Sequence, residues 1–321
     1  MATTCSQLAF VFPGRGSQSL GMMADLANNF PIVGEIFSEA SEILDYDLWQ
    51  LTQDGPVADL NQTDKTQPAM LAAGVATWRI WQQQTDILPA IMAGHSLGEY
   101  TALVCSGAIE FSDAIALVRD RGRYMQEAVP AGEGAMAAIL GLSDDQVRES
   151  CIEAAQGDVV AAVNFNAPGQ VVIAGNTTAV LRAIDICKTA GAKRAIQLPV
   201  SVPSHCDLMK PAAINMKQRL DEISISSPNV LVVNNVDVKM SSTPGDIRDA
   251  LVQQLYKPVR WVETITSMYN SNITTVIECG PGKVLVGLNK RINKDIRSLP
   301  ITDTDSLQLA IDTLNVTEET T

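Results

Sequence analysis

The chain has 321 residues, of which 46% are hydrophobic and 18% are charged, and these proportions exclude disordered and fibrous classes. Its 23 basic and 36 acidic side chains give a formal net charge of −13, which opposes general binding to nucleic acid or to an anionic membrane, because both are polyanions. At ~150 residues per domain, the length predicts about two structural units, or one large domain with an insertion.

Strand and helix patterns alternate along most of the chain. Short apolar runs bounded by turn residues predict strands at residues 8–12, 90–93 and 275–279. Helical patterns predict helices at residues 98–105, 113–127 and 283–292. Ser112 and Asp113 are candidate caps at the start of the second of these helices. The alternation predicts an α/β fold whose larger part holds a parallel sheet.

Residues 131–199 have a pattern of their own. The expected order is strand 135–140, helix 143–155, strands 159–164 and 170–174, helix 177–190 and strand 194–198. This βαββαβ order is typical of a ferredoxin-like unit, and the segments that flank it are rich in proline and glycine. We therefore expect a small ferredoxin-like subdomain at 131–199, inserted into a large catalytic body formed by residues 1–130 and 200–321.

The sequence gives no sign of a membrane segment, a metal or a nucleotide cofactor. No stretch approaches the ~20 apolar residues that span a bilayer, and the N-terminus does not have a signal-peptide pattern, so we expect a cytoplasmic protein. The six cysteines are dispersed without a CxxC pair, which favours reduced thiols over a zinc site or a disulfide framework. Neither the turn at 280–283 nor that at 14–19 has the spacing of a nucleotide-binding loop.

Gly94-His95-Ser96-Leu97-Gly98 fits the G-x-S-x-G pattern between a predicted strand and a predicted helix. Such a turn lifts a serine hydroxyl above the sheet edge and leaves the N–H of Leu97 available to an oxyanion. The alternative is an ordinary turn in which Ser96 caps the helix. The chain has only two histidines that could act as a base for Ser96. His95 adjoins Ser96 and is expected to make a structural contact, so His205 is the expected general base.

Two polar residues fall on predicted apolar helix faces. Arg121 lies in the middle of an apolar stripe, and a buried guanidinium requires a partner because its desolvation costs several kcal/mol. The partner is either an internal Asp or Glu or a carboxylate on a ligand, for which arginine has a two-pronged geometry. Gln254 lies on the inner face of a helix at 246–256, either as a core amide bonded to local backbone or as a residue that orients a catalytic group.

Eight stretches together resemble the bacterial malonyl-CoA:acyl carrier protein transacylases of type II fatty-acid synthesis. They lie in that family's order and spacing at residues 10–14, 16–18, 94–100, 121–122, 163–166, 200–205, 234–237 and 280–282. The resemblance implies a cytoplasmic enzyme with a large α/β-hydrolase-like body and a ferredoxin-like subdomain. Its substrates would be malonyl-CoA and acyl carrier protein, and it would need no cofactor or metal. We expect it to be a monomer.

The resemblance also implies the roles of individual residues. Ser96 would accept the malonyl group, His205 would act as the base, and Arg121 would bind the malonyl carboxylate. The main-chain carbonyl of Gln254 would orient the histidine. The oxyanion hole would use the N–H groups of Leu97 and of Arg15, which stands where the family has a glutamine.

Two other functions remain open from the sequence. One is a serine hydrolase or thioesterase that acts on an acidic acyl thioester, although no acid that could serve the histidine and no HGGG-type motif is evident. The other is an inactive module that binds acyl carrier protein or coenzyme A. A carrier protein, which is acidic in this family, would meet a basic run that includes Lys290 and Arg291, unless that run is only a solvated face.

Overall fold

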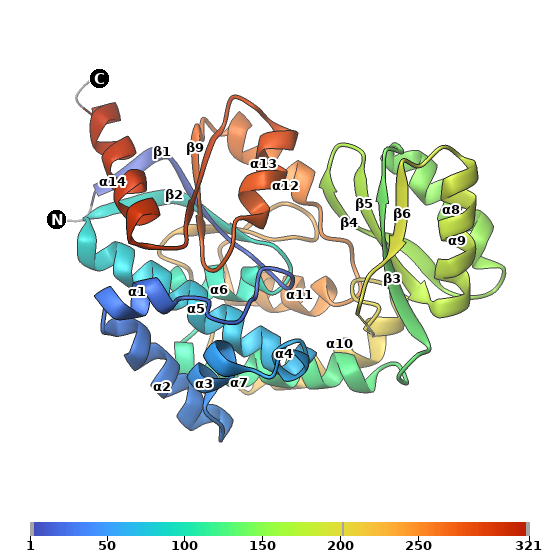
Figure 1. Cartoon of the computed structure of the whole chain (residues 1–321), viewed down its shortest axis with the longest axis horizontal. Helices are drawn as coiled ribbons and strands as arrows, with labels where there is room; N and C mark the ends of the chain where they lie inside the picture. Colours follow the sequence, from blue (N-terminus) through green and yellow to red (C-terminus); the bar gives the residue numbers. More distant parts are fainter. Residues whose placement is uncertain (1–2, 201, 319–321) are drawn as a thin grey trace.

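The computed structural model describes residues 3–200 and 202–318, the last three by their backbone alone, and contains two separate β-sheets (Figure 1). In the described part of the chain, the larger sheet has six strands in the order β10-β9-β1-β2-β7-β8. All neighbouring strands are parallel except the pair β7–β8. The strands are β1 (Thr3–Phe12), β2 (Ile87–Gly94), β7 (Leu231–Val233), β8 (Met240–Ser241), β9 (Thr275–Cys279) and β10 (Arg297–Ile301). The predicted α/β class is confirmed.

Helices cover both faces of the larger sheet. They are α1 (Ala24–Asn29), α2 (Ile32–Leu44), α3 (Leu48–Asp54), α4 (Val57–Leu60), α5 (Thr63–Gln84), α6 (Gly98–Cys105), α7 (Phe111–Glu127), η1 (Asp207–Met209), α10 (Lys210–Asp221), α11 (Pro244–Gln254), α12 (Trp261–Asn270), α13 (Val284–Ile292) and α14 (Thr304–Glu318). The second half of β1 is apolar on both faces for this reason: Phe10 and Phe12 pack into one core and Ala9 and Val11 into the other. The carboxyl ends of β1 and β2 are buried and lead into the turns that carry Arg15 and Ser96, at the edge of the sheet where the site lies.

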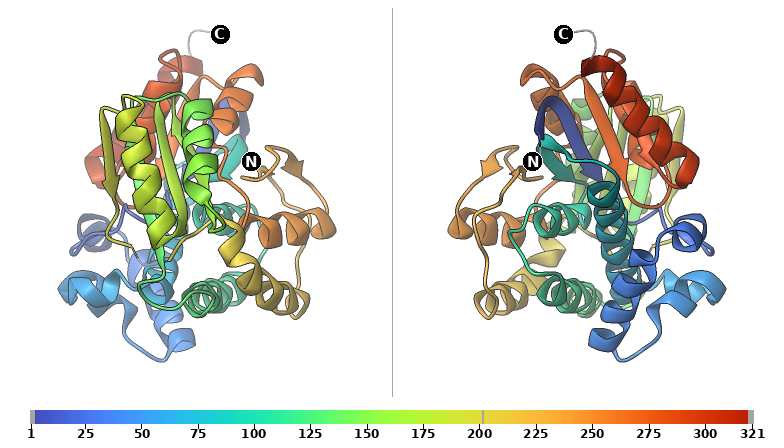
Figure 2. Two further views of the ribbon diagram at one scale, coloured as in Figure 1. Left: turned by 90° about the vertical axis from the view of Figure 1, so that its right-hand side faces the viewer. Right: turned by 90° about the vertical axis from the view of Figure 1, so that its left-hand side faces the viewer.

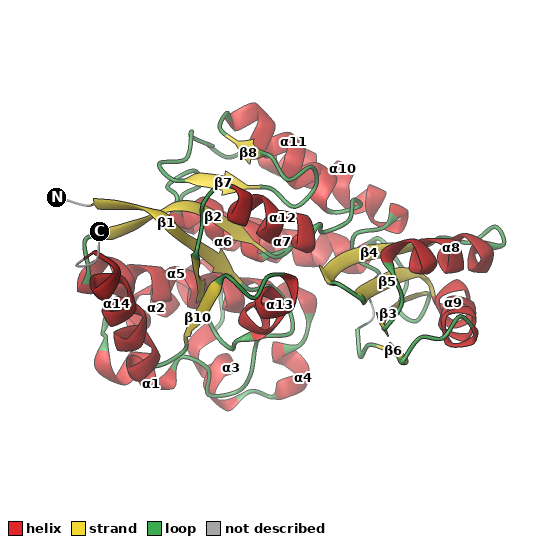
Figure 3. Ribbon diagram, turned by 90° about the horizontal axis from the view of Figure 1, so that it is seen from above, coloured by secondary structure: helices red, strands yellow, loops and turns green. Residues whose placement is uncertain are grey.

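The second sheet is antiparallel and has the order β4-β5-β3-β6. Its elements are β3 (Gly134–Leu140), α8 (Asp144–Ala155), β4 (Val160–Ala167), β5 (Gln170–Asn176), α9 (Thr177–Thr189) and β6 (Arg194–Gln197), so the βαββαβ order is as predicted. Helices α8 and α9 cover its outer face and share a core with it (Figures 2 and 3). The opposite face, which includes Met136 and Val172, meets the segment around Cys206 of the larger unit.

The start of α7 differs from the prediction. The helix begins at Phe111, and its N-cap is Glu110, whose side chain makes no capping hydrogen bond. Ser112 and Asp113 therefore lie inside the first turn, and the prediction that they cap the helix is wrong. The extended backbone of Glu110 allows its carbonyl to accept from the N–H of Ala114, so the helix starts before the residues that favour a cap. Asp113 still places a negative charge near the helix N-terminus.

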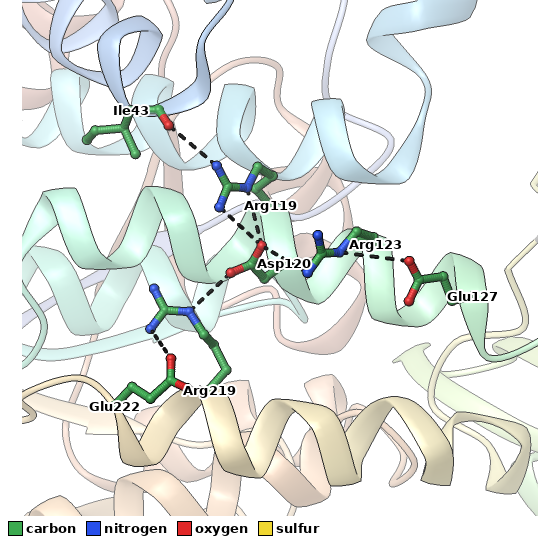
Figure 4. A network of polar contacts seen from close by, with 7 residues as sticks. All are labelled: Ile43, Arg119, Asp120, Arg123, Glu127, Arg219 and Glu222. Carbon is green, nitrogen blue, oxygen red and sulfur yellow. Dashed lines mark hydrogen bonds and ion pairs between the residues drawn. The ribbon is translucent and has the colours of Figure 1, made fainter.

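A polar network joins α7 to α10 (Figure 4). The nearly buried carboxylate of Asp120 contacts Arg119 Nη2 at 3.2 Å and Arg219 Nε of α10 at 3.1 Å. Helix α10 follows closely after His205, and α7 carries Arg121. The network therefore fixes the relative position of two helices that bear on the functional site.

Candidate active site

The turn between β2 and α6 is tight enough to require glycine at two positions. A Cβ on Gly94 would lie 1.8 Å from the carbonyl carbon of Gly98, and one on Gly98 would lie 2.0 Å from the carbonyl oxygen of Phe12. Ser96 has φ +53°, and its N–H donates to Asn235 Oδ1 at 2.7 Å. Asn235 Nδ2 donates in turn to the carbonyl of Gly94 at 2.6 Å. The side chain of Ser96 does not cap α6, which leaves its hydroxyl available to other partners.

His205 lies against that hydroxyl. Its Nε2 is 2.8 Å from Ser96 Oγ, and its Nδ1 is 2.7 Å from the main-chain oxygen of Gln254. A carbonyl only accepts, so Nδ1 carries the proton and Nε2 is the free acceptor that faces the serine. Burial and the positive charge of Arg121 lower the pKa of His205 to about 3, so the imidazole is neutral and able to take a proton.

Arg121 points toward the same serine. The residue is 2% exposed. Nη1 donates to Gln67 Oε1 at 2.7 Å, Nη2 donates to Gln254 Oε1 at 2.9 Å, and Nη2 also lies 3.4 Å from Ser96 Oγ. Its Nε atom is buried and has no hydrogen-bond partner. Among the described residues, none of the ion pairs involves Arg121. The internal ion pair that the sequence left open is therefore not formed.

Gln254 contacts four other residues of the site. Its main-chain oxygen holds His205 and its Oε1 holds Arg121, while Nε2 donates to the main-chain oxygen of Ser96 at 2.9 Å and to Glu99 Oε2 at 2.8 Å. None of these partners of its side chain belongs to the local backbone of α11. Gln254 is fully buried. The structure thus places it where it can orient both the histidine and the arginine.

The other histidine has different partners. His95 Nε2 lies 2.8 Å from Asn166 Oδ1, and the imidazole packs against the indole of Trp261 with ring centroids 5.5 Å apart. Burial lowers its pKa as well. This geometry matches the structural contact expected for His95.

The two N–H groups expected to bind an oxyanion lie on neighbouring turns. A Cβ on Gly14 would be 2.5 Å from the main-chain oxygen of His95, so the turn that contains Arg15 packs directly on the turn that contains Ser96. Within the described part of the chain, neither the N–H of Arg15 nor that of Leu97 donates a hydrogen bond. Both donors are thus free for a ligand.

The Arg15 side chain extends away from that turn. It is exposed, and Nη2 donates to the main-chain oxygen of Asn61 at 2.7 Å while Nη1 donates to Thr63 Oγ1 at 3.2 Å. The guanidinium therefore ties its turn to the start of α5.

A cavity of about 310 Å³ opens at Ser96 and His205. Turns and loops of the larger unit and strands of the second sheet line it, with the residues Arg15, Gly16, Gln18, Asn61, His95, Ser96, Met136, Asn164, Val172, Leu198, Pro199, Val200, Ser204 and His205. Ser201, in the 200–205 stretch, lies outside the described residues. The mixture of an apolar wall and a few convergent polar groups suits a small acyl thioester.

Lys290 and Arg291 lie apart from this cavity, near the end of α13. Arg291 Nη1 donates to Gln170 Oε1 of the second sheet at 2.6 Å. Lys290 lines a separate surface hollow of about 500 Å³ together with Lys294 and Arg297. The residues of the basic run are exposed on the surface, and none of them lines the cavity at Ser96.

Four buried or nearly buried polar residues of the site were not assigned a role from the sequence: Gln67, Glu99, Asn166 and Asn235. Asn166 and Asn235 stand in stretches that carry the family resemblance, but their hydrogen bonds join segments far apart in sequence. Glu99 had a recognisable signal, because it is the only charged residue in the otherwise apolar α6.

The described residues contain neither a cluster of metal ligands nor a membrane-spanning helix. No three His, Cys, Asp or Glu side chains are grouped so that they could hold a metal ion. None of the helices in the described ranges is both long and apolar enough to cross a bilayer.

Comparison with known proteins places the whole chain in one family. Residues 9–307 match the acyl transferase domain. The chain is 56% identical to the malonyl CoA-acyl carrier protein transacylase of Salmonella typhimurium over 306 residues, which cover 95% of this chain and 99% of the relative. It is 44% identical to the protein of the same name from Bacillus subtilis, over 96% of this chain and 98% of the relative.

Solved structures agree with the sequence relatives. An acyl carrier protein S-malonyltransferase from Vibrio cholerae has a TM-score of 0.93 and 57% identity, over 95% of this chain and 99% of the other. A malonyl-transacylase in complex with its type II PKS acyl-carrier protein has a TM-score of 0.95 and 55% identity, over 96% and 99% of the two chains. The chain belongs to the acyl transferase family and, within it, to the malonyl CoA-acyl carrier protein transacylases.

Proposed function

We propose that the chain moves a malonyl group from coenzyme A to the pantetheine thiol of acyl carrier protein through a malonyl ester of Ser96, for fatty-acid synthesis. One observation carries the proposal: a neutral histidine and an arginine that has no ion pair within the described residues converge on the hydroxyl oxygen of one serine. Ser96 Oγ is 2.8 Å from His205 Nε2 and 3.4 Å from Arg121 Nη2. The transacylase names of the relatives support the choice of malonyl and carrier protein.

In the first half of the reaction, His205 Nε2 takes the proton of Ser96 as Oγ attacks the thioester carbonyl. The N–H groups of Leu97 and Arg15 donate to the oxyanion, and their preorganised position stabilises the charge that develops there. The carbon–sulfur bond then breaks, and the departing coenzyme A sulfur receives the proton from His205.

In the second half, the same residues act in reverse on a different thiol. The pantetheine thiol of the carrier protein loses its proton to His205, and its sulfur attacks the ester carbonyl. The ester bond breaks, and Ser96 Oγ recovers the proton. The main-chain oxygen of Gln254 keeps the imidazole in the required tautomer throughout, where a serine hydrolase commonly has a carboxylate.

Arg121 gives the site its preference for an acidic acyl group. Its two amide partners are neutral, so they orient the guanidinium without cancelling its charge. A malonyl group on Ser96 brings its free carboxylate within reach of this cation, and a charge-assisted hydrogen bond forms. An acetyl group offers no such partner.

We further infer that the chain is divided into a hydrolase-like body, residues 1–130 and 200–321, and a ferredoxin-like subdomain, residues 131–199. The order of the second sheet and its separate core support this division. The chemistry requires no metal or redox cofactor, because the thioester is already activated and the chain supplies nucleophile, base and oxyanion donors. This one chain supplies all of these groups, so we propose that a monomer is a sufficient catalytic unit, and the proposed role in fatty-acid synthesis supports a cytoplasmic location.

Hydrolysis is the competing outcome, and the fate of the malonyl group separates the two. We expect malonyl-loaded protein to pass the group to holo-carrier protein far faster than to water. The measurement is the amount of malonyl-carrier protein against free malonate over a single turnover. Release of most of the malonyl group as malonate in the presence of carrier protein would identify a thioesterase.

A further inference from the structure

Glu99 is a buried carboxylate that the transfer described above does not use. It lies in the first turn of α6 and is 2% exposed. Its Oε2 atom accepts two hydrogen bonds, from the N–H of Asn235 at 3.0 Å and from Gln254 Nε2 at 2.8 Å. Removal of a carboxylate from water is costly, so its place against Gln254 calls for a physical reason.

The side-chain amide of Gln254 has an accepting end and a donating end. The donating end, Nε2, meets Glu99 Oε2 and the main-chain oxygen of Ser96. The accepting end, Oε1, meets Arg121 Nη2 at 2.9 Å. With the amide turned around, its NH2 group would face a guanidinium that has donors only, and its oxygen would face two other oxygens. Glu99 Oε2 and the main-chain oxygen of Ser96 therefore fix the orientation of the amide, so that its Oε1 atom faces Arg121.

We infer that Glu99 is a positioning residue for acyl-group selectivity: it fixes the Gln254 amide so that its oxygen holds the Arg121 guanidinium beside Ser96. The inference rests on the proposed function, because it takes the malonyl carboxylate as the ligand of Arg121. Gln67 Oε1 is the only other side-chain oxygen that holds the guanidinium at short distance in the described part of the chain. Without the oxygen of Gln254, the guanidinium is held on one side and Nη2 turns away from the serine.

The effect falls mainly on Arg121, because the Ser96 backbone keeps its hydrogen bond to Asn235 Oδ1 when the turned amide no longer donates to the main-chain oxygen of Ser96. His205 is held by the main-chain oxygen of Gln254, not by its side chain. A turned side-chain amide therefore leaves the pairing of His205 with Ser96 intact. Transfer of a neutral acyl group, which does not use Arg121, is retained while malonyl transfer falls.

Three substitutions of Glu99 separate the position of the acceptor from its charge. Glu99→Gln keeps an oxygen that can accept from both donors but removes the charge. Glu99→Asp keeps the charge but withdraws the acceptor by one methylene, and Glu99→Met removes the acceptor. The measurement is kcat/KM for acylation of Ser96 by malonyl-CoA and by acetyl-CoA.

We expect Glu99→Asp and Glu99→Met to lower the malonyl rate by about tenfold or more, and the acetyl rate by less than about threefold. Glu99→Gln should keep the malonyl preference of the unsubstituted protein. Circular dichroism checks folding, and if Glu99→Met does not fold, Glu99→Asp and Glu99→Gln decide the question.

Glu278 is the matched control, since it is also a fully buried glutamate and its Oε2 accepts from the N–H of Val286 in α13 at 2.7 Å. Glu278→Asp should leave the ratio of malonyl to acetyl rates unchanged. Equal losses for both donors in Glu99→Asp, or loss of the preference in Glu99→Gln, would overturn the inference. An unsubstituted protein without malonyl preference would instead contradict the proposed role of Arg121.

A double substitution tests whether Glu99 acts through Gln254. With Gln254→Met as the background, Glu99→Asp should change the ratio of malonyl to acetyl rates no further, because the amide that it positions is gone. A further fall of about threefold or more in this ratio in that background would show that Glu99 acts independently of the Gln254 side chain, and would overturn the inference.

Discussion

Ser96 and His205 both have positive φ angles, 53° and 67°, although neither is a glycine. Such a backbone conformation costs on the order of 1–3 kcal/mol per residue and persists only where its surroundings enforce it. Here the N–H of Ser96 donates to Asn235 Oδ1 and that of His205 to the main-chain oxygen of Leu255. The two strained residues face each other across 2.8 Å, which is the geometry that proton transfer requires.

Arg121→Ala tests the partner of the malonyl carboxylate. The substitution removes a charge-assisted hydrogen bond, so kcat/KM for malonyl-CoA should fall by about 100-fold. The rate with acetyl-CoA should fall by less than about tenfold, because the serine and the histidine remain paired. Parallel measurement of both donors provides the control, and equal losses would remove Arg121 as the selectivity residue.

The lowered pKa of His205 has a kinetic consequence. Burial, and then the charge of Arg121, lower the pKa to about 3, so the imidazole gains a proton only as the pH falls toward that value. The pH profile of kcat/KM for acetyl-CoA should therefore have no acid limb near the ordinary histidine pKa of about 6.5. Acetyl-CoA is the suitable donor because its acyl group does not ionise. A half-maximal rate near pH 6.5 would show that His205 titrates normally.

Individual residues were predicted from the sequence to very different degrees. Ser96 was predicted from a local pattern, and His205 followed because only two histidines exist. Glu99 is conspicuous as a lone charge in its helix, but its contact with Asn235 could not be predicted, since the two positions are 136 residues apart and no local spacing reports such a contact. The sequence likewise could not decide whether Arg121 pairs with an internal carboxylate or with a ligand, because its neighbours Gln67 and Gln254 come from distant helices.

At the scale of elements, the turn that carries Arg15 depends on its backbone more than on its side chain. The N–H of Gly16 donates to Gln18 Oε1 at 2.7 Å, and Gln18 Nε2 donates to Asn61 Oδ1 at 2.8 Å, so the turn remains tethered without the guanidinium. The oxyanion donor of Arg15 is a main-chain group that any residue except proline supplies.

Arg15→Gln should therefore leave kcat within about tenfold, which corresponds to less than about 1.4 kcal/mol. Arg15→Ala is the companion variant and should behave alike, because it also keeps the N–H group. Steady-state kinetics with malonyl-CoA and carrier protein provides the measurement. A larger fall in kcat for both variants would mean that the guanidinium itself takes part in transfer.

The sequence predicted elements best where the pattern was local. The strand at 275–279 coincides with β9. The helix expected at 143–155 is α8, which starts one residue later because Ser143 is its N-cap, with the reciprocal bonds of a capping box. Strand β1 begins at Thr3, well before the predicted start at residue 8. The prediction missed these first residues because they are largely exposed and do not form an apolar run. Helix α5 is buried along most of its length and around its axis, so it shows no amphipathic stripe and was not predicted.

At the scale of the whole molecule, a net charge of −13 opposes an acidic carrier protein, so association needs a local basic surface. Lys290, Lys294 and Arg297 share one surface hollow, and Arg291 reaches the second sheet. We propose this surface as the docking site, with long-range attraction that salt screens.

Reversal of both charges, Lys290→Glu with Arg291→Glu, should raise the KM for carrier protein by about tenfold at low salt, and by less at high salt. Acylation by malonyl-CoA alone should stay within about threefold, because neither residue lines the cavity at Ser96. The matched control reverses two charges on α10, Lys210→Glu with Lys217→Glu. An unchanged KM for carrier protein in the first variant would remove the docking proposal.

The proposed transfer depends above all on Ser96, which would carry the malonyl group between two thiols. Its most direct test is intact-protein mass spectrometry after incubation with malonyl-CoA, followed by peptide mapping and addition of holo-carrier protein. We predict one malonyl group per chain, on Ser96, absent from Ser96→Ala and lost from the enzyme when carrier protein is added. A malonyl adduct that persists in Ser96→Ala, or no adduct on the unsubstituted protein, would contradict the account.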